Sequence, residues 1–231
     1  MRTFLVGLVM TGALWAQQVD FAKQEIDTVK ITDSIYILMG GPAQGNVLVS
    51  VGTDGIFLVD SMYAPMHDKL MAAIRKLSPA PIRYVVNTHL HGDHTAGNSA
   101  FQKLGAVVIS QDNMRQRMVD LKMDGVPNMT YGSTLTLHFN GDEISIFHPA
   151  PAHTDGDSII FFKKANVMHV GDVPASLRYP NIGVNEGGTV DGMMAAGNQV
   201  MQVANAQTKI IPGHLGPVIG FGEIRQQMEM F

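Results

Sequence analysis

Alternating and clustered apolar positions in the first third of the chain predict β-strands. An alternation of apolar residues over 31–39 is typical of a strand with one buried face. Two short apolar runs follow at 47–51 and 56–59. They flank Asp54-Gly55, a pair that favours a tight turn because glycine adopts positive φ without strain. We therefore expect the two runs to form a β-hairpin.

Helical periodicity, with apolar residues every three or four positions, predicts four helices. They span 66–77, 95–104, 113–123 and 191–204. Phe101 and Leu104 are expected to face the core in the second helix, and Thr189 or Asp191 is expected to cap the last one. Further strands are predicted at 82–87, at 107–109 and on both sides of the turn 140–142. Because strands and helices alternate along the chain, the sequence predicts the α/β fold class.

The composition fits an ordinary globular protein. The chain has 231 residues, of which 45% are hydrophobic and 16% charged, which suffices for a sizeable core. No internal repeat or low-complexity linker divides it, so residues 17–231 are expected to form one domain, with the polar stretch 17–30 as a lead-in. The formal net charge is −4 and the basic residues are scattered, so no nucleic-acid partner is expected. The chain has no cysteine, which excludes disulfides and thiolate metal sites.

The N-terminus has the organisation of an export signal. Arg2 supplies a positive charge, an apolar segment follows over 4–14, and Ala16 offers a small residue at the cleavage point. The apolar segment is shorter than the ~20 residues that a membrane-spanning helix needs, so an uncleaved anchor is the weaker interpretation. We expect residues 1–16 to be a signal peptide, and the mature protein to be periplasmic or secreted, without stable membrane insertion.

A cluster of metal-type ligands directly follows the strand predicted at 82–87. Three histidines and an aspartate lie within residues 89–94, and imidazole nitrogen and carboxylate oxygen suit borderline divalent metals such as zinc. Three more residues of these types each follow a short apolar run further along the chain. The seven candidates are His89, His91, Asp93, His94, His153, Asp172 and His214. Apolar runs that each end in a metal-type ligand indicate a metal-dependent hydrolase.

The order and setting of these residues resemble the metallo-β-lactamase superfamily, over roughly residues 35–217. The resemblance implies a four-layer αββα sandwich and a site for two zinc ions. It assigns one ion to His89, His91 and His153, the second to Asp93, His94 and His214, and a bridging role to Asp172. Asp93 would also orient the attacking water and pass on its proton. The implied reaction is the attack of an activated water on the carbonyl of a small-molecule substrate such as a β-lactam, a lactone or an ester.

The aspartate at position 172 leaves more than one activity open. The β-lactamases of this superfamily usually carry Cys or Ser at the matching position, whereas Asp resembles the glyoxalase II-like and lactonase-like branches. A glyoxalase II-like thioesterase is therefore an alternative, although the expected export separates the protein from glutathione thioesters in the cytoplasm. An iron protein with oxygen-linked chemistry is a further alternative, because iron and manganese suit the same ligands. A non-catalytic binding protein is the last, and no particular oligomeric state is predicted.

Several other polar residues have both a structural and a functional interpretation. Asp60 either supports the metal ligands from behind, as the resemblance implies, or caps the turn after its strand. His67 is expected to be a solvated residue of a helix, and His138 and His169 to be hydrogen-bonded within strands. His148 is expected to be structural, with support of a metal ligand as the alternative.

The segments after the ligands are interpreted mainly as loops. Residues 154–158 fit a turn as well as hydrogen bonding to the site, and residues 176–188 fit a plain loop better than a substrate-contacting one. Leu215 stands directly after His214, where the resembled family commonly has glycine. The chain ends about a helix or more before the resembled proteins, which fits either a shortened form or the loss of a dispensable segment. Loss of a C-terminal helix would expose apolar core.

Overall fold

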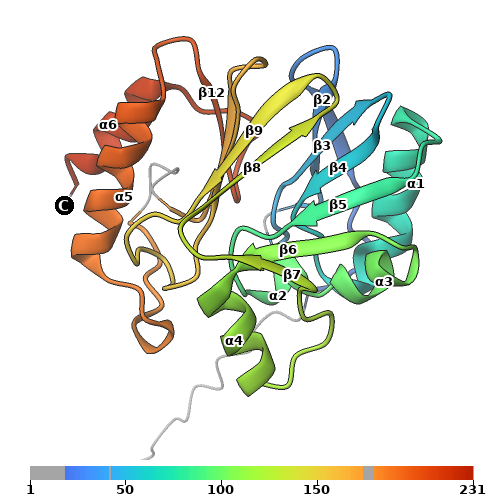
Figure 1. Ribbon diagram of the computed structural model, residues 1–231, viewed down its shortest axis with the longest axis horizontal. Coiled ribbons are helices and arrows are strands. Elements are labelled where there is room, and N and C mark those ends of the chain that lie inside the picture. Colours follow the sequence, from blue (N-terminus) through green and yellow to red (C-terminus); the bar gives the residue numbers. More distant parts are fainter. Residues whose placement is uncertain (1–18, 42, 174–178, 231) are drawn as a thin grey trace, which may run out of the picture.

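Two β-sheets lie face to face in the middle of the molecule, and helices cover the outer surface of each (Figure 1). The computed structural model describes residues 19–41, 43–173 and 179–230. The first sheet has the strand order β1-β2-β3-β4-β5-β6-β7, and the second has the order β12-β11-β10-β9-β8. The strands of the first sheet are β1 (Asp27–Lys30), β2 (Ile35–Met39), β3 (Val47–Gly52), β4 (Gly55–Val59), β5 (Ile82–Val86), β6 (Val107–Gln111) and β7 (Met129–Tyr131). Those of the second sheet are β8 (Thr134–Phe139), β9 (Asp142–Phe147), β10 (Ile159–Phe162), β11 (Val167–Gly171) and β12 (Lys209–Pro212).

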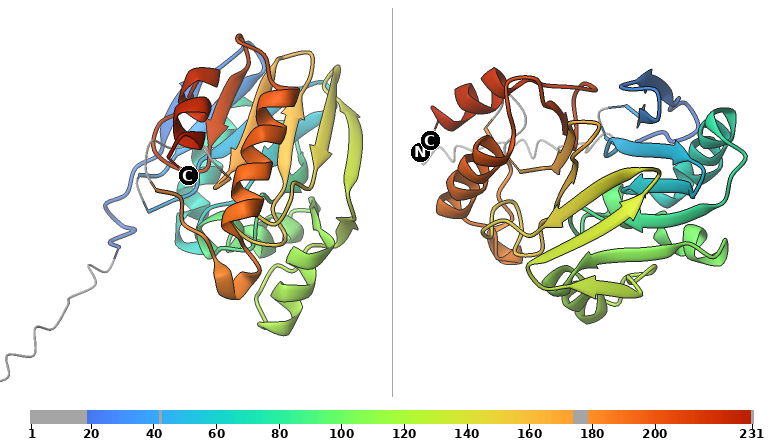
Figure 2. Two further views of the ribbon diagram at one scale, coloured as in Figure 1. Left: turned by 90° about the vertical axis from the view of Figure 1, so that its left-hand side faces the viewer. Right: turned by 45° about the horizontal axis from the view of Figure 1, so that its top comes forward.

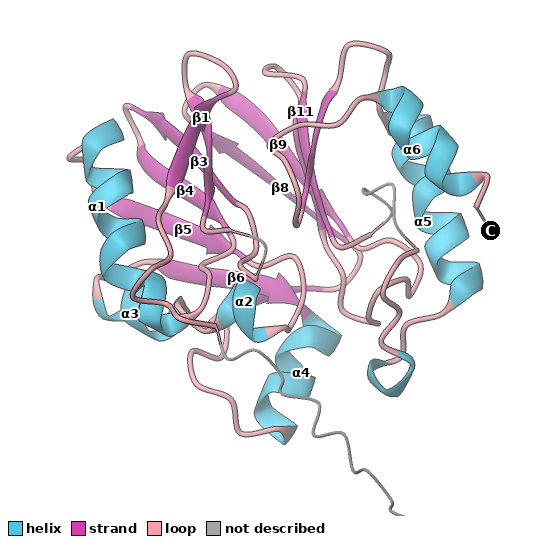
Figure 3. Cartoon of the chain, turned by 180° about the vertical axis from the view of Figure 1, so that it is seen from behind, coloured by secondary structure: helices cyan, strands magenta, loops and turns pink. Residues whose placement is uncertain are grey.

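The helices form two groups on opposite sides of the sheet pair (Figure 3). The first sheet carries α1 (His67–Leu77), α2 (Gly92–Thr95), α3 (Asn98–Lys103) and α4 (Asp112–Asp120), while α5 (Val190–Val203) and α6 (Phe221–Met228) lie on the second. Two short 3-10 helices are η1 (Ala64–Met66) and η2 (Val184–Glu186). The short α2 directly follows the ligand-rich segment after β5.

Apolar side chains fill three layers of core. Between the sheets, Phe57 packs against Phe139 and Phe162, with ring centroids 6.2 and 5.6 Å away. Leu70 of α1 packs on the outer face of the first sheet, and Met193 of α5 packs on the outer face of the second. The layers are therefore helix, sheet, sheet and helix, which confirms the predicted four-layer αββα sandwich.

Parallel strand pairing brings separate parts of the chain to one edge of the sheets. In the first sheet β5 pairs in parallel with β4 and β6, and in the second β11 pairs in parallel with β12. Asp60 directly follows β4, Asp172 directly follows β11, and His214 lies two residues after β12. Because the carboxyl ends of parallel strands meet at the same edge, these residues approach the segment after β5.

The hairpin and most of the long elements form where the sequence predicts them. β3 and β4 pair antiparallel, and Gly55, the first residue of β4 after the turn, has φ +124°. The single helix predicted over 95–104 is wrong, since the chain forms α2 and α3 with a break at Gly97. This glycine lies so close to Ser61 that a Cβ there would be 2.2 Å from the Ser61 carbonyl oxygen. Leu104, expected in the core, is 54% exposed because it lies just beyond the end of α3.

β1, β7 and α6 have no counterpart in the sequence prediction. β1 lies in the stretch interpreted as a lead-in, and most of its residues are exposed, so no apolar alternation marks it. β7 has only three residues, two of them exposed. Both are edge strands that pair with one neighbour, and their backbone hydrogen bonds are not visible as a hydrophobic pattern.

The helix α6 packs beside α5 and covers part of the second sheet (Figure 2). Ile224 of α6 is fully buried, and a Cβ at Gly197 of α5 would lie 2.1 Å from the sulfur of Met228. Close contact between the two helices therefore depends on the glycine. α6 thus covers apolar core near the end of the chain, where the sequence analysis considers such core to be exposed.

Two predicted features lie wholly or partly outside the described residues. These are the signal peptide at residues 1–16 and the first part of the loop at 176–188. Among the helices of the described ranges, none combines the length and hydropathy of a membrane span. The expectation of a cleaved export signal stays a prediction.

Thr189 caps α5, as one of the two predicted candidates. Its hydroxyl oxygen accepts from the backbone N–H of Gly192 at 2.9 Å, and the hydroxyl donates to the Pro151 carbonyl at 2.9 Å. Replacing Thr189 with Ala should lower the free energy of unfolding by about 1 kcal/mol, because it removes the cap. Urea unfolding of Thr189→Ala beside Thr189→Ser tests this. The serine variant keeps the hydroxyl and should match the wild type, whereas equal loss in both variants would assign the effect to the methyl group.

Candidate metal centre

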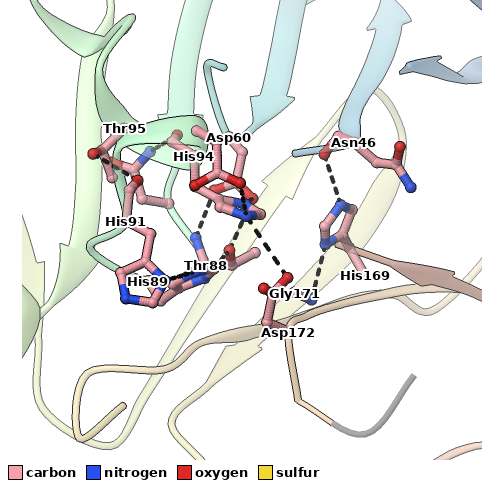
Figure 4. Close-up of polar contacts among 12 residues, drawn as sticks. Asn46, Asp60, Thr88, His89, His91, His94, Thr95, His169, Gly171 and Asp172 are labelled. Carbon is pink, nitrogen blue, oxygen red and sulfur yellow. Dashed lines mark hydrogen bonds and ion pairs between the residues drawn. The ribbon is translucent and has the colours of Figure 1, made fainter. Parts of the chain in front are cut away.

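The ligand-rich segment 89–94 comprises the end of the connection from β5 and most of α2, and buried hydrogen bonds hold it at both ends (Figure 4). The backbone N–H and the hydroxyl of Thr88 donate to the two carboxylate oxygens of Asp60, each at 2.8 Å. At the other end, the hydroxyl of Thr95 donates to the carbonyl of Leu90 at 3.1 Å. The backbone of the segment is therefore held from both sides, so its side chains keep a defined direction.

Three imidazole nitrogens from two segments form a first group of ligand atoms. His91 Nδ1 lies 3.2 Å from His89 Nε2 and 3.0 Å from His153 Nε2. His153 follows β9 in the second sheet, so this group joins the two sheets. Burial, together with the neighbouring imidazoles, lowers the pKa of His89 well below its usual value, and burial lowers the pKa of His153. Both rings are therefore neutral at physiological pH, the form in which imidazole binds metals.

One carboxylate and two imidazoles form a second group beside the first. Asp93 Oδ2 lies 3.3 Å from His94 Nε2 and 3.1 Å from His214 Nε2. The two Nε2 atoms are 3.2 Å apart. Asp93 and His94 belong to α2, whereas His214 follows β12, so this group also combines both sheets.

Asp172 lies between the two groups. Its Oδ1 is 3.6 Å from His94 Nε2, and its Oδ2 is 3.4 Å from His214 Nε2 and 3.8 Å from His153 Nε2. A Cβ at Gly213 would lie 2.0 Å from Asp172 Oδ1, so only glycine allows the ends of β11 and β12 to approach this closely. A single carboxylate thus reaches both groups, and the fold brings together all seven residues that the sequence singles out.

The donor atoms fit divalent metal ions. Ligands at 2.0–2.1 Å around a tetrahedral zinc are ~3.3 Å apart, and the five atom pairs given above for the two groups are separated by 3.0–3.3 Å. Asp172 Oδ1 is buried and has no hydrogen-bond partner, which suits an oxygen that faces a cation. His89, His91 and His153 could hold one ion, and Asp93, His94 and His214 a second.

Carboxylates concentrate negative charge at the second group. Burial lowers the pKa of His94, but the charges of Asp60 and Asp172 outweigh burial and hold this pKa well above its usual value. Burial likewise opposes ionisation of His214, but hydrogen bonds to Asp172 and Asp93 raise its pKa to about 9. Burial raises the pKa of Asp93, and the contacts with both imidazoles more than reverse this and lower it. This half of the centre therefore attracts positive charge.

Asp60 supports the ligands directly. Its Oδ2 lies 2.7 Å from Nδ1 of His94, so the imidazole N–H donates to it and leaves Nε2 facing the second group. The hydroxyl of Thr88, which donates to Asp60, lies 3.0 Å from Nδ1 of His89. Of the two interpretations of Asp60, the structure favours support of the ligands.

The loop after β9 is organised around the buried carboxylate of Asp157. It accepts from the backbone N–H of His153 at 2.8 Å and from the hydroxyl of Thr154 at 2.6 Å, and burial raises the pKa of Asp157 to about 7. His148 Nδ1 donates to the main-chain carbonyl of Asp157 at 2.7 Å. His148 therefore contacts the residue that holds His153, and not a proposed ligand itself. The segment 154–158 is thus a turn that also holds His153 in place.

Two contacts to the first group come from the loop at 176–188. His153 Nδ1 donates to the Asn181 carbonyl at 2.7 Å, and His91 Nε2 donates to Glu186 Oε2 at 2.8 Å. Neither contact is predictable from the sequence. The acceptor at Asn181 is a main-chain oxygen, and Glu186 does not follow an apolar run. Within its described part, this loop supports ligands rather than being a plain connection.

The three remaining histidines differ in how well the sequence predicts them. His169 is buried and hydrogen-bonded, as expected: Nε2 donates to the Asn46 carbonyl and Nδ1 accepts from the Gly171 N–H, each at 3.2 Å (Figure 4). His138 is exposed on β8, so the expectation of a structural hydrogen bond is wrong. His67 is half-buried, with its ring centroid 5.0 Å from that of Phe101, and is not a solvated side chain.

Comparisons with known proteins bear on the origin of this arrangement. A family model described as the metallo-beta-lactamase superfamily matches residues 40–110, which include the segment 89–94. A protein named metallo-beta-lactamase type 2 from Elizabethkingia meningoseptica is 23% identical over 202 residues, which are 82% of this chain and 79% of that protein. The chain is therefore similar in sequence to metallo-β-lactamases and shares their fold.

One solved structure and one further sequence relative extend the comparison. The structure of a metallo-beta-lactamase from Pontibacter korlensis superimposes with a TM-score of 0.78 at 19% identity, covering 89% of this chain and 98% of that one. A hydroxyacylglutathione hydrolase from Pelagibacter ubique (strain HTCC1062) is 30% identical over 97 residues, or 42% of this chain and 38% of that protein. The superfamily fold therefore extends over most of the chain.

Proposed function

We propose that the protein is a metallo-β-lactamase superfamily hydrolase that uses two zinc ions to hydrolyse a small carbonyl compound. The observation that supports this most strongly is the pair of ligand groups that share Asp172, each with the atom spacing that suits one zinc. When bound, zinc polarises a substrate carbonyl and lowers the pKa of a water molecule to near 7. We assign His89, His91 and His153 to one ion, Asp93, His94 and His214 to the other, and Asp172 to both.

Asp93 is the catalytic residue of this proposal. Its side chain is 15% exposed, so it borders the space open to solvent while one oxygen contacts His94 and His214. A carboxylate in this position can orient the attacking water and accept its proton, then pass the proton to the leaving group. The lowered pKa of Asp93 keeps the carboxylate ionised, the form that accepts a hydrogen bond from the attacking water.

The proposed substrate is a β-lactam, a lactone or an ester. The relative from Elizabethkingia meningoseptica is named for β-lactam hydrolysis, which supports a cyclic amide. The carbonyl of such a substrate is attacked without a serine or cysteine nucleophile, consistent with a site built from imidazoles and carboxylates. We further propose that residues 17–231 act as a single domain outside the cytoplasm, after removal of the signal peptide predicted at 1–16.

A glyoxalase II-like thioesterase is the second candidate. The match to the hydroxyacylglutathione hydrolase supports it, and so does the aspartate at position 172. The predicted export opposes it, because it separates the enzyme from glutathione thioesters in the cytoplasm.

Metal analysis and a substrate screen test these assignments. The protein would be purified without added metal, analysed for zinc, iron and manganese, then loaded with zinc and assayed against β-lactams, lactones, esters, S-acylglutathiones and phosphodiesters. We expect two zinc ions per chain and hydrolysis of the first three classes, which a chelator abolishes and zinc restores.

The other outcomes each overturn one part of the proposal. Preference for S-acylglutathiones would replace the leading assignment with the thioesterase. Iron as the dominant metal together with oxygen consumption would overturn zinc hydrolysis. Activity confined to phosphodiesters would overturn the carbonyl substrate class.

A further inference from the structure

A carboxylate outside the predicted ligand set touches one of the proposed ligands. Glu186 Oε2 lies 2.8 Å from His91 Nε2, and the side chains of Glu186 and His91 are 30% and 28% exposed. An ionised carboxylate only accepts hydrogen bonds, so Nε2 of His91 carries the proton and donates it. The lone pair of Nδ1 is then directed toward His89 and His153.

Among the three histidines of the first group, the orientation of the His91 ring depends most on a hydrogen bond. His89 and His153 are fully buried, so packing restricts the rotation of both rings. His91 is partly exposed, and it faces the group with Nδ1 whereas the other two rings face it with Nε2. A ring flip or a change of tautomer in His91 would turn an N–H or carbon toward the metal position. The hydrogen bond to Glu186 opposes both changes.

The backbone that carries Glu186 is tied to the loop of His153. The N–H of Gly183 donates to the His153 carbonyl at 2.9 Å, and the N–H of Glu186 donates to the Gly183 carbonyl at 2.8 Å. The N–H of Asp155 in turn donates to the Glu186 carbonyl at 3.0 Å. The segment 183–186 is therefore hydrogen-bonded to the loop that supplies His153, while its carboxylate contacts His91.

Arg117 of α4 fixes this segment from the side of the first sheet. Its Nε and one terminal nitrogen donate to the two carboxylate oxygens of Asp155 at 2.6 and 2.7 Å, a bidentate geometry that defines orientation as well as distance. Gly187 has φ +79°, and a Cβ there would lie 2.7 Å from Asp155 Oδ2. Gly187 therefore lets the segment 183–186 lie directly against the Arg117–Asp155 ion pair. This contact and the backbone hydrogen bonds to the loop of His153 together hold Glu186 in place.

We propose that Glu186 is a positioning residue for the three-histidine group: its carboxylate orients His91 and increases the basicity of Nδ1, and so strengthens metal binding there. The inference rests on the proposed two-metal function. Carboxylates that accept from a ligating histidine typically contribute 10–100-fold in metal affinity. By thermodynamic reciprocity, metal bound at this group stabilises the contact between His91 and the segment 183–186.

Zinc titration of the metal-free protein tests the role of Glu186. Wild type, Glu186→Ala, Glu186→Gln and Asn185→Ala would each compete with a chromophoric chelator for zinc alone. We expect Glu186→Ala to weaken one of two zinc affinities by about 10–100-fold and to leave the other unchanged. Glu186→Gln keeps an acceptor oxygen but loses the charge, so it should fall between wild type and Glu186→Ala. Asn185 is the matched control, because its exposed side chain lies in the same 3-10 turn.

A spectroscopic measurement separates positioning from general loss of structure. In the zinc-loaded wild type, the ¹⁵N shifts of His91 should show a protonated Nε2 and a metal-bound Nδ1, and Glu186→Ala should alter this pattern. Unchanged zinc affinities and unchanged His91 shifts in Glu186→Ala would overturn the inference while the proposed function stands. A wild type that binds no zinc would instead overturn the proposed function. If Glu186→Ala does not fold, wild-type zinc affinities in Glu186→Gln would overturn the inference.

Discussion

Replacing Asp93 with alanine is expected to lower the turnover of the proposed hydrolysis by about 10²–10⁴-fold while the fold survives. The carboxylate is removed from the second ligand group, where its Oδ2 lies 3.1 Å from His214 Nε2. The proton acceptor is lost together with one metal contact. The fold should tolerate the change because Asp93 lies in the one-turn helix α2, outside the apolar core layers.

Steady-state kinetics with zinc analysis and circular dichroism would measure this effect. Asp93→Asn is the shape-matched variant, and it should be impaired almost as strongly because an amide neither accepts the proton nor carries the charge. His138→Ala is the neutral control, since His138 is exposed on β8 and should affect neither zinc content nor kcat. Near-normal kcat in both Asp93 variants would remove this residue from the mechanism.

The seven proposed ligands are predictable from the sequence because each stands close behind a strand. An apolar run such as β5 or β11 is readable as a strand, and the residue after it lies at the carboxyl end of the sheet. Their meeting point depends on two sheets packed face to face, which the pattern of strands and helices does not specify. The αββα arrangement therefore follows from the family resemblance, and the separations of the ligand atoms only from the structure.

The supporting residues are harder to predict because their contacts are not local. Glu186 lies 95 positions from His91 in the chain and belongs to a segment with no apolar periodicity. Asn181 acts through its main-chain carbonyl, so its side chain carries no signal. For His67 the helix is predicted correctly but the surroundings of the side chain are not, because its contact with Phe101 depends on how α1 and α3 pack.

Asp60→Ala is expected to lower the free energy of unfolding by about 3–5 kcal/mol and to weaken zinc binding at the second group by about 10–100-fold. Asp60 is fully buried and accepts from the N–H and hydroxyl of Thr88 and from Nδ1 of His94. Alanine leaves these donors without an acceptor in a place that water does not reach. Asp60 also has φ +66°, a conformation that alanine adopts with strain.

Urea unfolding of the metal-free protein and zinc competition would measure the two effects of Asp60→Ala separately. Asp60→Asn keeps the shape and tolerates positive φ, but its amide offers one acceptor oxygen instead of two, so both losses should be smaller. Asp27→Ala on the exposed strand β1 is the control for the loss of one carboxylate, and it should change neither quantity. Full stability with weaker zinc binding in Asp60→Ala would mean that Asp60 acts on the metal centre alone. Unchanged zinc binding would show that the hydrogen bond to His94 does not orient the ligand.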